Sequence, residues 1–242
     1  KAQSSFLKFL LFVSLFHQLV AGPIVRYSHI ADEIDHRIFR WRDFSNGITR
    51  FSIGLFKKVC IANIAGGLCA QFLDSDLSSL SVAGGWYGLV MYSLQIYFDF
   101  SGYSDMAIGL GRMFGFHYHE NFNYPYIAKS ATDFWRRWHI SLGTFFRDYV
   151  YIPMGGNKKN GYLNLFVVWG LTGLWHGANW NFIFWGLFFG ILIMLERLIT
   201  FKRINKVPGF FLRIYLLLVF SIRIVVNQFH GRPFPCCIYT WQ

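Results

Sequence analysis

Residues 163–195 read LNLFVVWGLTGLWHGANWNFIFWGLFFGILIML, in which two apolar runs flank the polar stretch HGANWN. The first run, Leu163 to Trp175, would form about 20 Å of α-helix. That length falls short of the hydrocarbon core of a bilayer, which is roughly 30 Å thick. In a membrane the turn would therefore stop at depth, where non-helical backbone must be buried in protein or line a wet cavity. The stretch predicts a helical hairpin whose turn forms one wall of a pocket.

The composition supports a membrane setting. The chain has 242 residues, of which 54% are hydrophobic, 21% aromatic and 14% charged. Soluble domains carry about a quarter charged residues, so this chain has too few to cover its own surface. The net charge of +11 lies in short clusters between apolar runs, which is typical of cytoplasmic loops and anionic lipid contacts. We therefore expect a lipid bilayer as partner and no nucleic acid, since no groove-reading or base-stacking module is present.

Apolar segments elsewhere predict further helices. Segment 5–25 is long enough to cross a bilayer, and 209–226 is the last clear apolar element. Segment 47–66 is apolar but holds Lys57 and Lys58 at its centre. Two lysines at mid-bilayer would cost several kcal/mol, so an interfacial or re-entrant helix is predicted there.

Segment 84–115 combines two patterns. Its first half is a plausible span, and its second half is rich in glycine and serine, which suits close helix contact in a membrane bundle. Asp99 and Asp105 fall within it. We expect both carboxylates to be structural, paired with Arg112 or Arg137.

Residues 117–156 interleave aromatic and basic side chains, which is typical of a helix at the headgroup boundary. Ser130-x-x-Asp133 is a helix-start capping signal. After it, apolar residues at helical spacing predict one continuous helix through Phe134, Trp138, Leu142, Phe145 and Tyr149.

His176 in the hairpin turn has two interpretations. A neutral imidazole, which desolvation favours, can accept a proton from a hydroxyl as a general base. Gly177 would permit close substrate approach, and Asn179 could orient the ring or donate to a developing oxyanion. Alternatively, His176 is a structural histidine that bonds one carbonyl and ties two helices together.

His139 presents the same choice. It could line the same cavity, although spacing alone favours an interfacial anchor beside Trp135 and Trp138. His117 and His119 stand two residues apart with no further ligand set evident, so no metal site is predicted.

The ordered combination of several motifs resembles the membrane-bound O-acyltransferase superfamily, in particular its bacterial alginate O-acetyltransferase branch. The stretches that carry the resemblance are HQLVAGPIVRY (17–27), LQIYFDFSGYSDMAIGLGRMFGF (94–116), ENFNYPYIAKSATDFWRRWHISLGTFFRDYVYIPMGGN (120–157) and LTGLWHGANWNFIFWGL (171–187).

The resemblance implies an all-α, polytopic membrane fold with a central funnel and interfacial or re-entrant helices. His176 in LWHGANW and His139 in WRRWHISL match the two characteristic histidines of the family, which makes them the candidate catalytic residues. Asn179, Trp175 and Arg137 are candidate substrate-binding residues beside them.

By the same resemblance, the protein is expected to move an acyl group from a cytoplasmic thioester such as acetyl-CoA toward hydroxyls of an exported polysaccharide such as alginate. No bound cofactor is expected. The expected partners are the acyl donor and either the polysaccharide or a periplasmic acetyltransferase. The expected location is the bacterial inner membrane, with several spans. D-Alanyl transfer to teichoic acid, in the same superfamily, is the nearest alternative.

Two departures from the family pattern are expected. First, residues 1–242 are expected to form a single domain that lacks the family's N-terminal helices. Second, residues 225–242 do not resemble the usual continuation of the family, and a truncation or a frameshift would explain this tail. The remaining alternatives are a transporter, because broken helices and mid-membrane polar turns occur there too, and a non-catalytic remnant.

Overall fold

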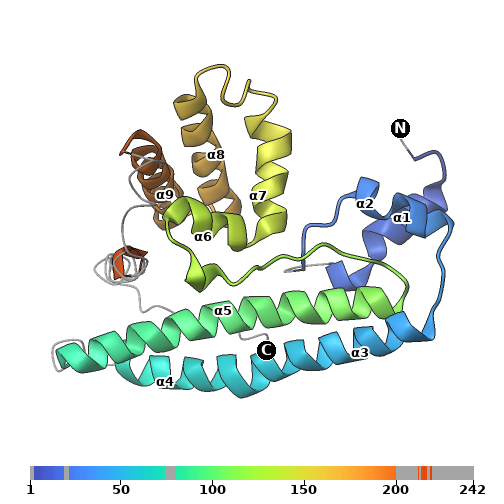
Figure 1. Ribbon diagram of the computed structural model, residues 1–242, viewed down its shortest axis with the longest axis horizontal. Helices are drawn as coiled ribbons and strands as arrows, with labels where there is room; N and C mark the ends of the chain where they lie inside the picture. The colour runs from blue at the N-terminus through green and yellow to red at the C-terminus, as the bar shows by residue number, and fades with distance from the viewer. Residues whose placement is uncertain are drawn as a thin grey trace. The chain divides into compact units, whose positions relative to one another are not determined.

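The computed structural model describes residues 3–18, 22–74 and 80–199, together with Leu212, 214–216 and Val219 (Figure 1). Within these residues the chain is helical and has no β-strand, which confirms the all-α prediction. It divides into two compact units, one within residues 1–121 and one within 122–232. The tail at 225–242 and most of the predicted element 209–226 lie outside the described residues.

The first unit is built around a long antiparallel helix pair. In chain order it contains α1 (Phe6–Ser14), the 3-10 turn η1 (Phe16–Gln18), α2 (Tyr27–Asp35), α3 (Trp41–Phe56), the π-helical turn η2 (Lys57–Ala62), α4 (Asn63–Leu73) and α5 (Val82–Met113). The run from α3 through α4 is continuous and lies along α5 (Figure 1).

Glycines on α3 and α5 let their backbones touch. A Cβ added at Gly54 would lie 2.5 Å from the carbonyl oxygen of Gly102, and one at Gly47 would lie 2.7 Å from that of Gly109. Each pair of glycines is seven residues apart on its own helix, so the same face of each helix recurs at the contact. The close helix contact predicted for the second half of 84–115 is confirmed.

Replacing Gly54 with alanine is expected to lower stability by about 1–3 kcal/mol, because the new methyl group meets backbone that cannot move aside. Gly67 on α4 is the matched control, since a Cβ there meets nothing within 4 Å. Gly67→Ala should be neutral or slightly stabilising, through helix propensity. Thermal unfolding in detergent measures both variants, and equal melting temperatures would contradict the close contact.

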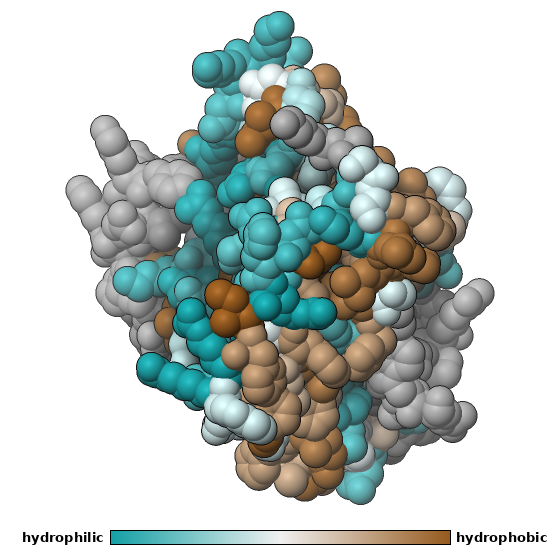
Figure 2. All heavy atoms as spheres, turned by 90° about the vertical axis from the view of Figure 1, so that its right-hand side faces the viewer, coloured by the Kyte–Doolittle hydropathy of each residue, from teal (hydrophilic) through white to brown (hydrophobic). Residues whose placement is uncertain are grey.

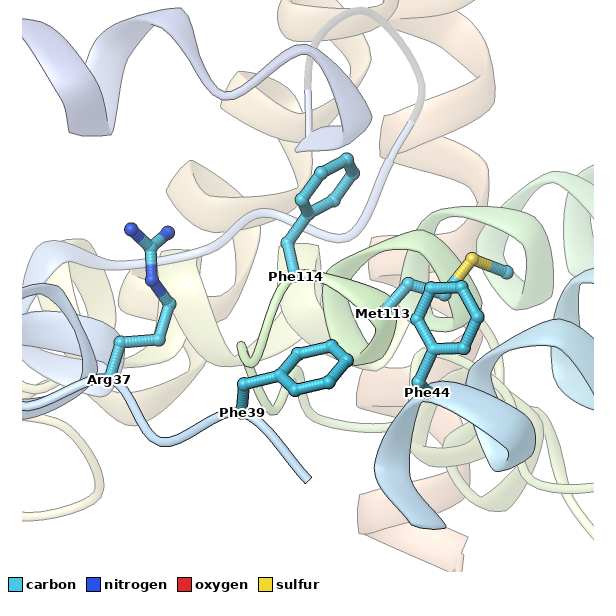
Figure 3. A pocket seen from close by; sticks show the side chains of 5 residues that line it. All are labelled: Arg37, Phe39, Phe44, Met113 and Phe114. Atoms are coloured by element: carbon cyan, nitrogen blue, oxygen red, sulfur yellow. The ribbon is translucent and has the colours of Figure 1, made fainter. Parts of the chain in front are cut away.

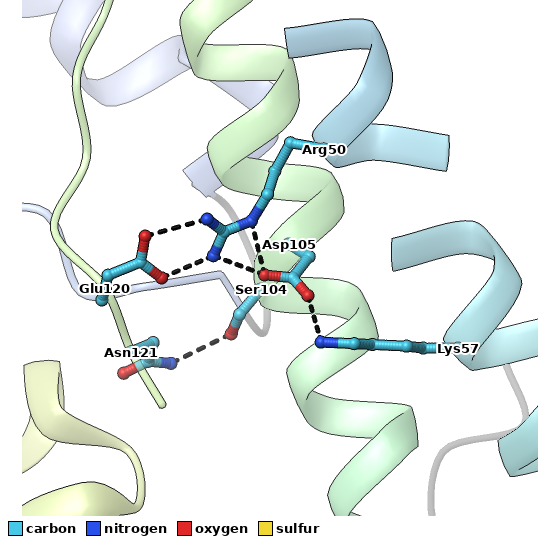
Figure 4. Close-up of polar contacts among 6 residues, drawn as sticks. All are labelled: Arg50, Lys57, Ser104, Asp105, Glu120 and Asn121. Atoms are coloured by element: carbon cyan, nitrogen blue, oxygen red, sulfur yellow. Dashed lines mark hydrogen bonds and ion pairs between the residues drawn. The ribbon is translucent and has the colours of Figure 1, made fainter. Parts of the chain in front are cut away.

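Charged side chains also tie α3 and η2 to α5. Arg50 Nε donates to Asp105 Oδ1 at 2.7 Å, and Lys57 Nζ lies 2.5 Å from Asp105 Oδ2 (Figure 4). Arg50 also forms a two-point contact with the Glu120 carboxylate, at 2.9 and 2.5 Å. Lys58 pairs with Asp99 at 2.5 Å.

These pairs correct two predictions. The re-entrant alternative for segment 47–66 is wrong, because the segment lies within one continuous helical run of 33 residues, Trp41–Leu73, that is long and apolar enough to cross a membrane; the interfacial alternative stays a prediction. The predicted free-energy cost of placing Lys57 and Lys58 at mid-bilayer applies to unpaired lysines, whereas both have carboxylate partners in the structure. Asp99 and Asp105 are both ion-paired, as expected, but their partners come from α3 and η2 and are not Arg112 or Arg137.

Segment 5–25 does not form the single spanning helix that was predicted. The helix α1 ends at Ser14, where the Gln18 side chain donates to the Phe12 carbonyl oxygen. His17 then turns inward, with its ring stacked on Tyr118 and hydrogen-bonded to the Tyr118 hydroxyl. Burial of His17 diverts the chain from its helical course.

The second unit contains the predicted hairpin. Its elements are the 3-10 turn η4 (Pro125–Ile127), α6 (Ala131–Arg137), α7 (Ile140–Phe146), the π-helical turn η5 (Arg147–Tyr151), α8 (Gly161–His176) and α9 (Trp180–Ile199). The arms α8 and α9 meet so closely that a Cβ at Gly186 would lie 2.2 Å from the Trp169 carbonyl oxygen. With 16 residues, α8 is about 24 Å long, still short of a bilayer core.

The continuous helix predicted after Ser130 is wrong. Its start is confirmed, since Ser130 Oγ accepts the Asp133 backbone N–H at 3.0 Å. The helix breaks at Trp138 and His139 because the Arg137 carbonyl accepts the Asn123 backbone N–H, at 2.9 Å, instead of a donor on a following helical turn. Two short helices, α6 and α7, replace one long helix.

Large apolar side chains are exposed along the helices. Among the described residues, two helices are long and apolar enough to cross a membrane, Trp41–Leu73 and Trp180–Leu198. The first half of 84–115, predicted as a span, is not among them. Figure 2 shows hydrophobic residues gathered in patches beside hydrophilic ones on one face. Trp41 and Trp180 are exposed at the starts of the two candidate spans, as tryptophans at a membrane boundary often are.

Candidate active site

His176 is the last residue of α8, and its ring is held by the turn before it. His176 Nδ1 lies 2.8 Å from the backbone carbonyl oxygen of Thr172. A carbonyl oxygen only accepts, so Nδ1 carries the proton. In a neutral imidazole the lone pair is then on Nε2, the nitrogen that a general base uses.

Aromatic rings surround this imidazole. Its ring centroid lies 4.6 Å from that of Trp185, 4.8 Å from that of Trp175 and 6.4 Å from that of Phe182. A Cβ on the next residue, Gly177, would approach the Phe182 ring to 2.8 Å, so a glycine is needed for the chain to turn there. The half-buried His176 therefore sits in a mostly apolar setting.

His139 lies at the break between α6 and α7. Its backbone adopts the left-handed conformation, with φ +46°, which non-glycine residues rarely take. The side chain is buried, with Nδ1 3.4 Å from Ser141 Oγ. Burial, and secondarily the neighbouring His176, lower the pKa of His139 below its ordinary value. His139 is thus uncharged at neutral pH.

The two histidines share a neighbour. The ring centroid of Trp175 lies 6.0 Å from that of His139 and 4.8 Å from that of His176. Segments 37 residues apart in the sequence thus meet within the second unit. Spacing alone favoured His139 as an interfacial anchor, but its side chain is buried and faces this aromatic group.

The other predicted site residues occupy different settings. Trp175 is 53% exposed and bridges the histidines. Arg137 Nε donates to Asp133 Oδ1 at 2.9 Å, and its Nη1 donates to the Asn123 carbonyl, so the guanidinium is anchored to α6. Asn179 is exposed, and its Oδ1 accepts the Asn181 backbone N–H at 3.2 Å at the start of α9. The orientation of the His176 ring comes from Thr172, not from Asn179.

A family model described as MBOAT, membrane-bound O-acyltransferase family, matches residues 1–240. The chain belongs to the membrane-bound O-acyltransferase family. The resemblance identified from the motifs is confirmed, and members of this family are membrane proteins.

Individual relatives narrow the position within the membrane-bound O-acyltransferases. The chain is 46% identical over 210 residues to a probable alginate O-acetylase of Azotobacter vinelandii, covering 86% of this chain and 41% of that protein. It is 46% identical over 200 residues to a peptidoglycan O-acetyltransferase of Helicobacter pylori, covering 80% and 38%. A teichoic acid D-alanyltransferase of Bacillus subtilis is 30% identical over 258 residues, covering 97% and 64%. The chain spans about two fifths of the length of the first two relatives.

Glu196 on α9 was not singled out from the sequence. Its carboxylate accepts the backbone N–H groups of Ala131 and Thr132, at 2.6 and 2.9 Å, and the Thr132 hydroxyl at 2.7 Å. It thereby caps the first turn of α6, which ends at Arg137, two residues before His139. The available signal was a lone acidic residue at the end of a long apolar run.

Replacing Glu196 with alanine is expected to destabilise the second unit by about 1–3 kcal/mol, because buried amide donors of α6 lose their acceptor. Glu196→Gln retains one acceptor oxygen and should recover part of the loss. Thermal unfolding in detergent compares the two variants with the wild type. An alanine variant as stable as the wild type would show that Glu196 does not hold α6.

Proposed function

We propose that this protein is an O-acyltransferase that moves an acetyl group from a thioester on the cytoplasmic side toward a hydroxyl of an exported glycan. The observation that carries the proposal is the hydrogen bond from His176 Nδ1–H to the Thr172 carbonyl, which leaves the lone pair on Nε2. The family and the relatives support the reaction type.

The proposed step begins with the acceptor hydroxyl hydrogen-bonded to His176 Nε2. The imidazole takes the hydroxyl proton while the oxygen attacks the thioester carbonyl carbon. The carbon–sulfur bond of the tetrahedral intermediate then breaks, and the thiolate takes the proton from the imidazolium. The products are an ester, a thiol and a neutral His176.

His139 and its neighbours would position the reactants. The buried, uncharged His139 can hydrogen-bond a substrate oxygen without placing a charge in an apolar site. Trp175 would pack against the acyl group between the two imidazoles. Arg137 and Asn179 would contact the polar parts of the donor and the acceptor near the mouth of the site.

The acceptor class rests on the relatives. Identity is 46% to both the alginate and the peptidoglycan acetyl-transfer proteins, against 30% to the teichoic acid D-alanyltransferase. This difference supports acetyl over D-alanyl transfer, and glycan hydroxyls as the final acceptor. Alginate is the acceptor we propose, reached directly or through a periplasmic acetyltransferase partner.

The proposed donor is acetyl-CoA or another acyl thioester, which acts as a substrate and not as a bound cofactor. The proposed location is the bacterial inner membrane, with several spans. The two candidate spans and the exposed apolar helix faces support a membrane-embedded chain.

Inverted membrane vesicles from cells that express the protein can test the proposal, with coenzyme A carrying a labelled acetyl group supplied outside. We expect alkali-labile label on a glycan or on a partner protein, and none in vesicles from cells without the protein. Labelled solute inside the vesicles with no covalent label would instead support the transporter alternative.

A further inference from the structure

A hollow lies within the first unit. It has a volume of about 420 Å³, which is in the range of ligand pockets. Its lining comes from the segment between α2 and α3, from the first turn of α3 and from the end of α5 (Figure 3). The lining residues are Arg37, Phe39, Phe44, Met113 and Phe114.

The wall of this hollow is apolar and aromatic. The ring of Phe39 makes an edge contact with Trp41, at 5.3 Å between centroids, and lies 6.0 Å from Phe44. Phe39 is 55% exposed and Trp41 is 76% exposed. An exposed cluster of this kind attracts hydrocarbon and not water.

The rim is basic. Arg37 at the edge of the hollow is followed by Arg40 and Arg42, so positive and apolar residues alternate in HRIFRWR. Among the described residues, no carboxylate partner is recorded for any of the three guanidinium groups. Arg37 is instead held above the ring of Phe116, at 5.2 Å from Cζ to the centroid.

The acidic groups nearby are engaged elsewhere. Asp35 pairs with Lys8 at 2.7 Å, and Glu33 lies 2.7 Å from His117 Nδ1. Asp43 lies 4.0 Å from His117 Nε2. The arginines of the rim are therefore available to an anion from outside the chain.

The hollow also has the right position for a membrane boundary. Trp41 is the first residue of the candidate span Trp41–Leu73. Tryptophan and arginine side chains concentrate where a span meets the headgroups. The rim would face phosphates while the aromatic wall faces acyl chains.

We propose that this hollow binds one anionic phospholipid, with its phosphate among Arg37, Arg40 and Arg42 and an acyl chain against Phe39 and Phe44. Each basic residue near an anionic lipid surface contributes about 1 kcal/mol to the binding free energy, which is roughly a fivefold increase in affinity. The three together select a phosphatidylglycerol headgroup over a zwitterionic one.

Native mass spectrometry of the detergent-purified protein, titrated with phosphatidylglycerol or phosphatidylcholine, tests the proposal. The wild type should bind one phosphatidylglycerol at least tenfold more tightly than phosphatidylcholine. Arg37→Gln/Arg40→Gln/Arg42→Gln should lose that preference. The matched control Arg136→Gln/Lys158→Gln/Lys159→Gln removes three exposed charges elsewhere and should keep it.

Phe39→Ser provides a second arm, because it changes an exposed wall residue without changing charge. Phe39→Ser should weaken the binding of both lipids. Glycerol phosphate, which has no acyl chain, should not bind measurably to the wild type. Equal binding of the two lipids by the wild type would overturn the proposal. Unchanged lipid selectivity in the triple arginine variant would also overturn it, as would an equal loss of selectivity in the control variant. A protein dimer that the triple arginine variant dissociates would overturn it too, because the arginines would then bind a second copy of the chain.

Discussion

His176→Ala is expected to lower acetyl transfer by about a hundredfold to ten-thousandfold, the range that a positioned general base contributes. Alanine removes Nε2, the nitrogen that would take the proton of the acceptor hydroxyl. Ester content of the secreted glycan, or label transferred in membrane vesicles, measures the loss. Activity within a few fold of the wild type would remove His176 from the reaction.

Two further variants separate chemistry from folding. His176→Gln can still hydrogen-bond but cannot take a proton, so it should be nearly as inactive as the alanine variant. Thr172→Val removes the Thr172 hydroxyl, which bonds the Val168 carbonyl at 2.8 Å, but keeps the backbone carbonyl that holds His176. It should retain most of the activity.

Asp105→Ala is expected to cost about 3–5 kcal/mol in stability, because it leaves Lys57 and part of the Arg50 guanidinium facing a mostly buried site without a carboxylate. Asp105→Asn keeps the shape but not the charge, and should lose nearly as much. Thermal unfolding in detergent measures both variants. An Asp105→Asn variant as stable as the wild type would show that the carboxylate charge is not needed.

Glu120 supplies the matched control. Its side chain is 55% exposed, so its pair with Arg50 is screened by solvent and Glu120→Gln should cost less than about 1 kcal/mol. The double variant Lys57→Leu/Asp105→Leu removes both charges of the buried pair. It should recover much of the stability that Asp105→Ala loses.

The hairpin could be predicted from the sequence because it depends on local pattern. Apolar runs at 162–175 and 180–196 are bounded by glycine, asparagine and basic residues, and the structure places helices at Gly161–His176 and Trp180–Ile199. The glycines of 84–115 likewise indicated a close contact with another helix, but they did not identify that helix.

The features that were missed depend on contacts between distant segments. The break before His139 requires Asn123 to reach the Arg137 carbonyl. The partners of Asp105 are set by the register between α3 and α5, which apolar spacing does not encode. The end of α1 follows from burial of His17 beside Tyr118, a residue 101 positions away.

The account depends on His176 being a neutral imidazole with its proton on Nδ1. Solid-state NMR of the ¹⁵N-histidine-labelled protein in lipid bilayers reads this directly, with the His176→Gln variant identifying the signal. At pH 7 we predict a protonated Nδ1 and an unprotonated Nε2. A proton on Nε2 instead, or an imidazolium with both nitrogens protonated, would contradict the account.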